Sequence, residues 1–451
     1  MNIVILAAGK GTRMHSDMPK VLQPLAGKPM LQHVVAASRA LGVGRIVVVV
    51  GHGSAAVREA LAGQEGISFA EQPQQRGTGD ALRVALPCLE ASDPRTLVLL
   101  GDVPLITSAT LQRFCEKVPG GVGLLSVMME DPTGYGRIIT EHGNVVRIVE
   151  QKDATDEELL VREVNTGIML LPTDRLNDWL SGLSCSNAQG EYYLTDVIAM
   201  AAKEGIPVRS FPAPDAKEVM GVNGKAELAA AERVWQMRQA GELLASGVTL
   251  ADPARLDIRG EVSCGRDVFI DVGCLFEGKV TLGDRVKVGA YCVLRNVSVA
   301  SDAEILPFSH LDGAEIGESS RIGPFTRLRP GAVLARQTHV GNFCEIKKST
   351  VGEGSKVNHL SYIGDTTMGA HVNIGAGTIT CNYDGVHKFQ TVIGDDAFIG
   401  SDTQLVAPVT VGAGATIGAG TTLTRPAPAG KLTLSRARQS TIEGWKRPEK
   451  K

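Results

Sequence analysis

The sequence of 451 residues predicts two architectures in succession, an α/β domain with a doubly wound, mostly parallel sheet and then a parallel β-helix. The first is predicted because aliphatic strands alternate with an amphipathic helix, and because polar, glycine-containing segments directly follow the strands. The second is predicted because an aliphatic residue recurs every six positions in the C-terminal half. A period of six fits neither the 3.6 of a helix nor the 2 of an ordinary strand, but it fits hexapeptide coils.

The strands of the first domain are short aliphatic runs. Residues 3–7, 46–50 and 96–100 read as strands buried on both faces. A helix between the first two carries its apolar face at Leu31, Val34, Val35 and Leu41, with Pro29 near its start and Gly42 past its end. Strands that alternate with helices imply a mostly parallel sheet covered on both sides, with ligands bound beyond the carboxyl ends of the strands.

The loop after the first strand has the composition of a phosphate site. Gly9 and Gly11 would let backbone amides approach phosphate oxygens, while Lys10, Arg13 and Lys20 supply positive charge. The loop matches neither a Walker motif nor Gly-x-Gly-x-x-Gly. Two glycines after a strand, taken alone, more often form a tight turn.

Asp102 follows the strand at 96–100 and is a candidate metal ligand. An aspartate at this place is commonly a turn or capping residue. Beside a phosphate-type loop the favoured interpretation is a Mg²⁺ ligand, because this ion takes one or two carboxylates together with substrate phosphates.

The second domain carries two unbroken hexad series in its C-terminal half. They are Ile316, Ile322, Leu328, Leu334, Val340, Ile346 and Ile393, Ile399, Leu405, Val411, Ile417, Leu423. We expect each aliphatic residue to point into the axis of a prism. We expect the small residue after it, most often glycine, to turn the corner with a positive φ.

The hexad period is interrupted at two places. The step from Ile346 to Val351 is five residues, and Ile374 and Ile393 lie nineteen apart. Insertions in a solenoid loop out on one face and often carry function, so 378–391 is a candidate protruding loop. His359 lies near the five-residue steps, where a single histidine is more often a structural or surface residue.

A helix connects the two predicted domains. Residues 225–246 are rich in Ala, Glu, Leu and Arg and contain no proline, and Gly224 and Gly247 flank them. Asp252-Pro253 then ends the helical pattern. We therefore predict a first domain over 1–224, a linker helix over 225–247 and a β-helix with a C-terminal tail over 248–451.

Composition excludes several classes of protein. A net charge of −3 argues against a protein built mainly to bind nucleic acid or anionic membranes. The sequence has no apolar run near the ~20 residues of a membrane span and no basic targeting segment at its start. The eight cysteines are scattered without a Cys-x-x-Cys pair, which favours reduced thiols and a cytoplasmic protein.

Two motifs resemble known enzyme families. The string 6–14 with Pro19-Lys20 resembles the signature of sugar-1-phosphate nucleotidyltransferases. The hexads resemble those of hexapeptide-repeat acyltransferases, whose coils wind left-handed, an exception to the usual right-handed crossover.

Further segments, each ambiguous alone, extend this resemblance to the whole chain. They are 72–79, 134–137, Glu150, 165–167 and 190–196. Together they resemble the bifunctional N-acetylglucosamine-1-phosphate uridylyltransferase/glucosamine-1-phosphate acetyltransferase family. The resemblance implies acetyl transfer from acetyl-CoA to glucosamine-1-phosphate. Uridylyl transfer from UTP to N-acetylglucosamine-1-phosphate would follow, with Mg²⁺ and release of pyrophosphate.

The resemblance also implies roles for residues of the first domain. Those expected to hold the uridine nucleotide are Leu6, Ala7, Ala8, Gly9, Lys20, Gln72, Gly77 and Thr78. Those expected to hold the acetylated sugar are Gly136, Glu150 and Asn165. Asp102 and Asn223 would bind Mg²⁺, with Asn223 also close to the substrate, while Lys20 and Arg13 would offset charge that accumulates during transfer.

Roles in the β-helix follow in the same way. His359 would be the general base of acetyl transfer. Glucosamine-1-phosphate would be bound by Arg329, Lys347, Tyr362, Asn373 and Lys388. Acetyl-CoA would contact Ala376, Asn382, Tyr383, Ser401, Ala419 and Arg436, and would lie between the prisms of a homotrimer. The last basic residues, including Arg438, Lys446, Arg447, Lys450 and Lys451, are expected to be a solvated end.

Two other functions remain compatible with these motifs. A sugar-1-phosphate nucleotidyltransferase with a non-catalytic, oligomerising β-helix would show no acetyl transfer. An assembly protein with a degenerate first domain would not turn over UTP. The set of Lys20, Asp102 and Asn223 weighs against the assembly protein, and the pair of His359 and Tyr383 weighs against the non-catalytic solenoid.

Overall fold

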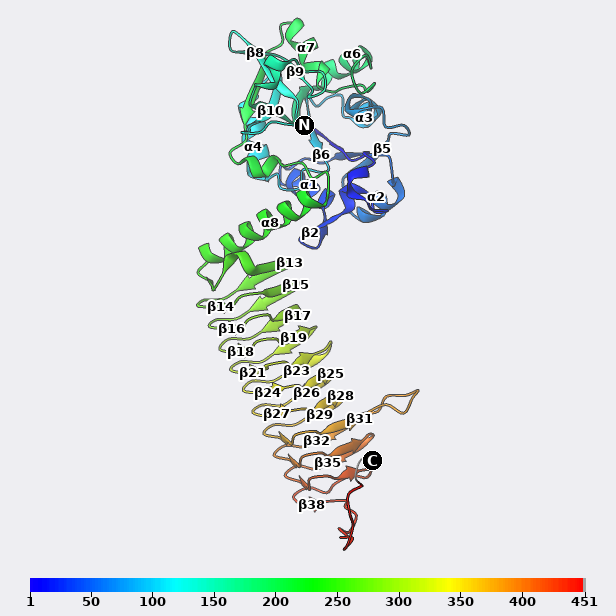
Figure 1. Cartoon of the computed structure of the whole chain (residues 1–451), viewed down its shortest axis with the longest axis vertical. Coiled ribbons are helices and arrows are strands. Elements are labelled where there is room, and N and C mark those ends of the chain that lie inside the picture. The colour runs from blue at the N-terminus through cyan, green and yellow to red at the C-terminus, as the bar shows by residue number, and fades with distance from the viewer. Residues whose placement is uncertain (449–451) are drawn as a thin grey trace. The chain divides into compact units, whose positions relative to one another are not determined.

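The computed structural model describes residues 1–448 and divides into two compact units, Met1–Trp235 and Gln236–Lys451. Figure 1 labels the elements of each unit. Lys450 and Lys451 of the predicted basic tail lie outside the described residues. Within the described part of the chain, no helix is both long and apolar enough to cross a membrane.

Unit 1 is built on a mostly parallel sheet, as predicted. Its strand order is β11-β7-β10-β6-β1-β4-β5, and only β10 runs antiparallel to its neighbours on this path. The hairpin of β8 and β9 is attached through β10. The bounds are β1 Asn2–Leu6, β4 Ile46–Val50, β5 Ile67–Glu71, β6 Arg95–Leu100, β7 Val122–Met128, β8 Arg137–Glu141, β9 Asn144–Val149, β10 Glu163–Pro172 and β11 Val208–Pro212. A small hairpin pairs β2 (Pro24–Leu25) with β3 (Lys28–Pro29).

Helices cover both faces of this sheet because successive strand residues point to opposite sides. Ile3 and Ile5 share one core with Leu31 and Phe114, whereas Val4 lies in another. The helices are α1 Met30–Arg39, α2 Ser54–Ala60, α3 Thr78–Ala85, α4 Ser108–Lys117, α5 Asp156–Leu159, α6 Leu176–Ser181 and α7 Asp196–Lys203. The doubly wound α/β fold is therefore confirmed.

Helix α8 (Lys225–Ala245) contains the division between the two units, which falls between Trp235 and Gln236. Its first half belongs to unit 1, where Ala231 is fully buried in a cluster with Met14 and Met30. The predicted division at 1–224, 225–247 and 248–451 stays a prediction.

Unit 2 is a parallel β-helix with three stacks of short strands (Figure 1). One stack is β12 Thr249–Leu250, β14 Phe269–Ile270, β16 Lys287–Val288, β18 Glu304–Ile305, β21 Arg321–Ile322, β24 His339–Asn342, β27 Lys356–His359, β30 Asn373–Ile374, β33 Phe398–Ile399, β36 Thr416–Ile417 and β38 Leu432–Thr433.

The other two stacks share β13 Leu256–Cys264, β15 Cys274–Leu282 and β17 Val293–Val299 and then separate. One continues as β19 His310–Asp312, β22 Arg327–Leu328, β25 Glu345–Lys347, β28 Tyr362–Gly364, β31 Ile379–Cys381, β34 Gln404–Val406 and β37 Thr422–Leu423. The other continues as β20 Ala314–Ile316, β23 Ala332–Leu334, β26 Ser349–Val351, β29 Thr366–Met368, β32 Thr391–Ile393 and β35 Val409–Val411.

The hexad residues form the core of the prism, as predicted. Residues of both series are buried in a single cluster, from Ile316 to Leu423. Each coil pairs in register with the next, for example Ile322 with Val340 and Ile399 with Ile417. Parallel coils with hexapeptide repeats confirm the predicted β-helix of the left-handed class.

The expected reason for the glycines after the hexad residues is wrong at most positions. Among them Gly323 has a positive φ, of 104°, but Gly341, Gly352 and Gly375 do not. At these three positions an added Cβ would lie 2.1 to 2.5 Å from an atom of the next coil. Glycine is therefore required because neighbouring coils approach closely, and the positive φ values fall mostly on other residues, such as Phe343.

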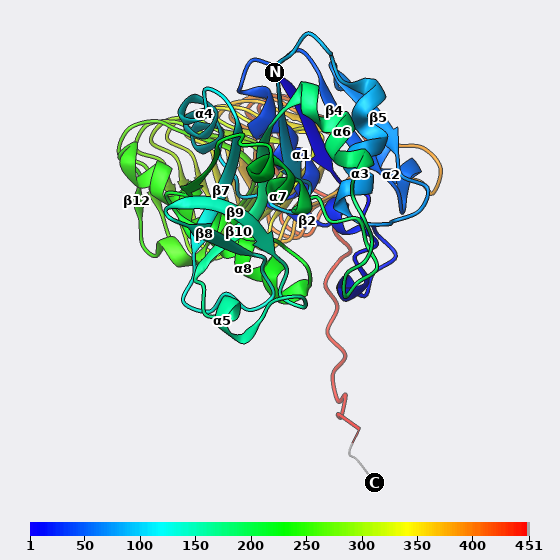
Figure 2. The same cartoon turned by 90° about the horizontal axis from the view of Figure 1, so that it is seen from above.

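The chain leaves the coils after β38. Residues 434–448 are exposed and form no helix or strand. Figure 2 shows this segment running away from the solenoid as an extended chain. The exposure agrees with a solvated basic end for Arg438, Lys446 and Arg447.

Candidate functional site

Unit 1 contains a cavity of about 560 Å³ beyond the carboxyl ends of β1 and β6. Parallel α/β sheets place ligands at this edge. Of the residues predicted for nucleotide, sugar and metal, the cavity is lined by Leu6, Arg13, Thr78, Asp102, Gly136, Glu150, Asn165 and Asn223. The fold thus brings together residues more than 200 positions apart in the sequence.

Lys20, Asp102 and Asn223 converge on one point. The Lys20 Nζ donates to Asp102 Oδ2 at 2.5 Å and to Asn223 Oδ1 at 3.2 Å. Both side chains of the ion pair are largely buried, with 13% and 19% exposed. Two oxygens from distant parts of the chain therefore face a single cation position, which the lysine ammonium takes in this structure.

The carboxylate oxygen of Asp102 and the amide oxygen of Asn223 are suitable ligands for Mg²⁺. The ion prefers carboxylate and amide oxygens and completes its shell with water and substrate phosphates. Within residues 1–448 no group of three or more His, Cys, Asp or Glu side chains gathers as a metal site. A metal at Asp102 and Asn223 would therefore rest on one carboxylate, one amide oxygen and oxygens of the substrate.

The glycine loop packs closely beside this point. Gly11 has a φ of 60°, and an added Cβ would lie 2.5 Å from Lys20 Cβ, so only glycine fits there. The Ala7 amide donates to Val49 O at 2.9 Å and fixes the loop to β4. Gly9 and Lys10 are exposed, while Ala7 and Ala8 are buried.

Gln72 and Gly77 do not line the cavity. They lie in the segment that connects β5 to α3. The buried Gln72 Nε2 donates to Gly77 O at 3.1 Å and to Asp80 Oδ2 at 3.0 Å. Burial alone would raise the pKa of Asp80, but this bond and the nearby Arg76 and Arg83 lower it below its usual value. Because Gly77 O and the Asp80 carboxylate can only accept hydrogen bonds, the Gln72 side chain must turn its Nε2, not its Oε1, toward them.

The three residues predicted for the sugar are neighbours in the cavity. The Asn165 amide donates to Gly136 O at 2.9 Å. A Cβ added to Gly136 would lie 3.4 Å from both Glu150 carboxylate oxygens, so this glycine leaves the carboxylate uncrowded. Thr195 donates to Glu150 Oε1 at 3.0 Å, yet burial raises the pKa of Glu150 above its usual value.

Three further lining residues were not singled out from the sequence. Tyr135 and Thr195 lie within the segments 134–137 and 190–196, whose composition gave no residue-level signal. Glu227 lies in α8, and nothing in a helix rich in Ala and Glu distinguishes it. Only the folded chain places these side chains at the cavity.

In unit 2, residues predicted for acetyl transfer stack along one corner of successive coils. The Gly377 amide donates to His359 O at 3.2 Å, and the Asp402 amide donates to Ala376 O at 2.7 Å. The same column continues with Gly420 N to Ser401 O at 2.8 Å and Arg436 Nε to Ala419 O at 3.1 Å. His359, Ala376, Ser401, Ala419 and Arg436 thus form one ladder, although their spacing in the sequence is uneven.

His359 is exposed and has a defined partner. Its Nδ1 lies 3.3 Å from Asn342 Oδ1, a residue of the preceding coil that the sequence did not single out. An amide oxygen can only accept, so this contact selects the tautomer with hydrogen on Nδ1. The Nε2 atom is then left with a lone pair, as a general base requires.

Three cations of unit 2, Arg329, Lys347 and Lys388, lie close to one another. Lys388 is close to Lys347 and, with burial and the charge of Arg329, lowers the pKa of Lys347. Arg329 Nη1 also donates to Glu345 Oε1 at 2.8 Å. Such a group of like charges is suited to a phosphate dianion. Tyr362 pairs with Glu345 on the adjacent coil, and so lies in the same neighbourhood.

Asn373 lies apart from this group. It pairs with Lys356 and Phe398 in the stack that contains β30. No hydrogen bond joins its side chain to the cation group or to His359 among the residues that the structure describes. Its predicted role in binding the sugar phosphate stays a prediction.

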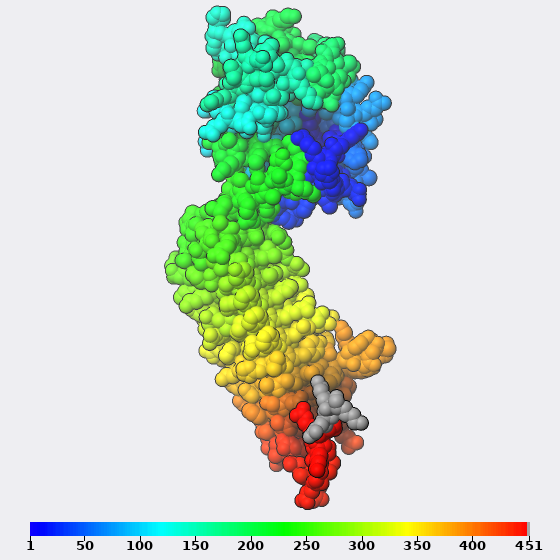
Figure 3. Space-filling view, viewed as in Figure 1, coloured from blue at the N-terminus to red at the C-terminus, as the bar shows by residue number. Residues whose placement is uncertain are grey.

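The predicted protruding loop is a hairpin at 382–390. Tyr383 and Lys388 pair across it, and Asp384 Oδ1 accepts from the amides of Val386 and His387 at 2.8 and 2.6 Å. Asn382 is buried at its base, where it donates to Asp365 Oδ2 at 2.5 Å. Figure 3 shows the hairpin projecting from the coils. Tyr383 in this hairpin is 59% exposed.

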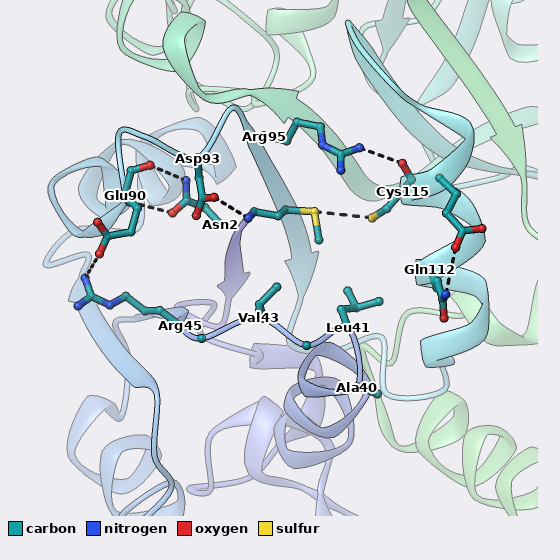
Figure 4. A pocket seen from close by; sticks show the side chains of 14 residues that line it. Asn2, Ala40, Leu41, Val43, Arg45, Glu90, Asp93, Arg95, Gln112 and Cys115 are labelled. Atoms are coloured by element: carbon teal, nitrogen blue, oxygen red, sulfur yellow. Dashed lines mark hydrogen bonds and ion pairs between the residues drawn. The ribbon is translucent and has the colours of Figure 1, made fainter.

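A second cavity of unit 1, about 800 Å³, lies at the amino ends of β1 and β6, the opposite edge of the sheet. Its polar groups are paired with one another (Figure 4). The terminal amine bonds Asp93 at 2.7 Å, Arg45 pairs with Glu90, and Arg95 donates to Cys115 O at 3.0 Å. None of the predicted site residues lines it.

Comparison with known proteins gives matches over both units. The description "MobA-like NTP transferase domain" matches residues 3–137, and "Bacterial transferase hexapeptide (six repeats)" matches 390–425. "Bifunctional protein GlmU" of Cupriavidus pinatubonensis is 60% identical over 453 residues, covering 100% of this chain and 99% of that protein. Proteins of the same name from Bordetella parapertussis and Chromobacterium violaceum are 59% and 56% identical, with 100% of this chain covered in each case. Similarity at this level over both units confirms the predicted resemblance. The chain therefore belongs to the GlmU family of bifunctional transferases.

Proposed function

We propose that unit 1 transfers a uridylyl group from UTP to N-acetylglucosamine-1-phosphate, and that unit 2 transfers an acetyl group from acetyl-CoA to glucosamine-1-phosphate. The two reactions in sequence would make UDP-N-acetylglucosamine and pyrophosphate. The assignment of uridylyl transfer to unit 1 rests on one observation. Lys20, Asp102 and Asn223 converge on one cation position at the edge of the cavity. The assignment of acetyl transfer to unit 2 rests on the ladder from His359 to Arg436.

In uridylyl transfer, the chain's own residues position two phosphates and offset their charge. Gly136, Glu150 and Asn165 would hold the acetylated sugar so that its phosphate faces the α-phosphorus of UTP in line. Arg13 and Lys20 would balance the negative charge that accumulates as pyrophosphate leaves. A Mg²⁺ ion held by Asp102 and Asn223 would supply further charge neutralisation at the reacting phosphates. The substrate phosphate is itself the nucleophile.

In acetyl transfer, Arg329, Lys347 and Lys388 would hold the phosphate of glucosamine-1-phosphate. His359 Nε2 would take a proton from the sugar amine as the nitrogen attacks the thioester carbonyl. The new amide bond forms as the carbon–sulfur bond breaks, and the proton that His359 has taken passes to the leaving sulfur, so that coenzyme A leaves as the thiol. General-base help of this kind contributes about 10²- to 10⁴-fold in rate. Asn382, Tyr383 and the corner residues of the ladder would position acetyl-CoA.

Two variants of the full chain, with one substitution in each unit, test whether each unit carries out the reaction proposed for it. We expect Asp102→Ala to abolish pyrophosphate release from UTP while acetyl transfer stays near the wild-type rate. We expect His359→Ala to lower acetyl transfer by about 10²-fold or more while acetyl-CoA still binds. Acetyl transfer at the full rate in His359→Ala would return His359 to a structural or surface role and exclude it as the general base. UTP turnover that persists in EDTA would overturn the metal assignment.

We further propose that the protein is a homotrimer joined through one side of the prism. The three stacks differ in the residues they present to solvent. On the stack from β23 to β35 the outward residues Val333, Thr350, Thr367, Val392 and Thr410 are uncharged and exposed in the single chain. The stack from β16 to β27 presents mostly charged residues, Lys287, Glu304, Arg321, His339 and Lys356. An uncharged face is the better candidate for burial between copies, and closed cyclic symmetry lets one such patch serve every copy.

A further inference from the structure

We propose that Arg137 is a positioning residue for the sugar side of the uridylyl-transfer cavity, an inference that rests on the proposed function of unit 1. Its side chain is 1% exposed and does not line the cavity. It therefore acts through its neighbours. It would fix the three residues assigned to the acetylated sugar phosphate relative to one another.

Arg137 is adjacent to each of those three residues by a different route. It directly follows Gly136 in the chain. It pairs with Val164, the residue before Asn165, across β8 and β10. It pairs with Val149, the residue before Glu150, across β8 and β9.

The guanidinium closes this arrangement with hydrogen bonds. Its Nη1 donates to Tyr135 O, and its Nη2 donates to Gln151 Oε1 at 2.7 Å. The same Gln151 oxygen accepts from the Gly134 amide at 3.1 Å. The loop at 134–136 and the end of β9 are thus tied to one rigid, planar group, which a lysine could not replace in both bonds.

The stability of the fold does not by itself explain why the charged side chain of Arg137 is buried at this position. Among the described residues Arg137 forms no ion pair within 4.0 Å, and its buried Nε has no hydrogen-bond partner. A buried charge without a paired carboxylate is costly, and an apolar side chain of similar volume commonly stabilises as well or better. Residues that break such a local rule are typical of functional sites.

The kinetic test uses Arg137→Met in the full chain. We expect KM for N-acetylglucosamine-1-phosphate to rise about tenfold or more, the effect of losing a buried hydrogen-bonded anchor. We expect KM for UTP to stay within about twofold, because the nucleotide side is held by other segments. Acetyl transfer by the same sample, measured on unit 2, should not change. Arg137→Lys should recover little of the affinity.

The matched control is Arg95→Met. Arg95 is also a partly buried guanidinium that donates to backbone carbonyls, of Cys115 and Val118 at 3.0 Å each, but at the opposite edge of the sheet (Figure 4). It should lower the melting temperature without changing KM for the sugar phosphate. If both variants lose stability and neither changes this KM, Arg137 is merely structural and the inference fails.

A second pair of variants decides the matter if Arg137→Met does not fold. Gln151→Glu keeps an acceptor for Arg137 and for the Gly134 amide, whereas Gln151→Met removes it. We expect the sugar-phosphate KM to rise in Gln151→Met and to stay close to wild type in Gln151→Glu. Equal KM values in the two would overturn the inference. Failure of the proposed function would look different, since the wild-type protein itself would then not turn over UTP with this sugar phosphate.

Discussion

Among single residues, Glu150 gives unit 1 a pH-dependent stability. Burial raises the pKa of Glu150 in the folded state, above the value of about 4.3 for an unperturbed glutamate. Below pH 4 the carboxyl is protonated in both states and costs nothing. As pH rises through the raised pKa, the folded state must bury a charge that the unfolded state leaves in water, so the free energy of unfolding falls.

We therefore expect Glu150→Gln to raise the melting temperature at pH 8 but not at pH 4. In a unit of this size each kcal/mol recovered is worth about 2–4 °C. Thermal melts of both proteins between pH 4 and pH 8 measure the difference. A gain that is the same at every pH would mean that the substitution improves packing instead of removing a buried charge.

Among elements, the hairpin at 382–390 is an insertion in an otherwise regular stack. Thr366 pairs with Thr391, twenty-five residues later, whereas Thr391 pairs with Val409, eighteen later. Excising residues 383–389, seven in all, should leave the coil closed because the strands on both sides keep their partners. It removes Tyr383 and Lys388 from the proposed acetyl-transfer site.

We expect this deletion to abolish acetyl transfer, to leave uridylyl transfer at the wild-type rate and to keep the β-rich circular dichroism of unit 2. The matched control replaces Val386, an exposed residue at the hairpin tip, with serine, and should leave both activities intact. A deletion protein that still transfers acetyl groups at the full rate would exclude the hairpin from the site.

For the whole molecule, the uncharged face of the prism predicts how copies assemble. Thr367→Lys places a charge at the centre of that face. We expect light scattering to report trimers for the wild-type protein at micromolar concentration and a shift toward monomers for this variant. The same substitution at Thr416, which is exposed on the stack from β12 to β38 and lies outside the uncharged face, should leave the trimer intact. Monomeric wild-type protein with full acetyl transfer would refute the proposed assembly.

The two units also predict where the chain can be divided. Ala231 and Trp235 of α8 pack with unit 1, and Glu232 accepts a hydrogen bond from the Ala26 amide at 2.7 Å. A fragment ending at residue 228 removes this packing, so it should melt lower than a fragment ending at 245. Both should lack acetyl transfer, and the longer one should keep uridylyl transfer. Equal melting temperatures would show that the first half of α8 adds nothing to unit 1.

Several features of the protein follow from the sequence by itself, because they depend on local periodicity. The run at Ile46–Val50 is short and entirely β-branched, which favours a strand, and the six-residue period of the C-terminal half fits the coils of a β-helix, so both were predictable. The resemblance of the glycine loop and of the segment around His359 to known families was equally visible. Membership of the family is carried by the sequence alone.

The tertiary structure decided what depends on distant segments meeting. Only the folded chain brings Lys20 to Asp102 and Asn223, sets Asn342 against His359, and places Arg137 among the sugar-site residues. It also gave another reason for the hexad glycines, such as Gly341, because the spacing between coils is not encoded within a single coil. A contact across more than 200 residues leaves no periodic trace in a sequence, and in the β-helix the period predicts that coils stack but not which side chains become partners. A side chain's partner is fixed only when the strands that carry it are paired.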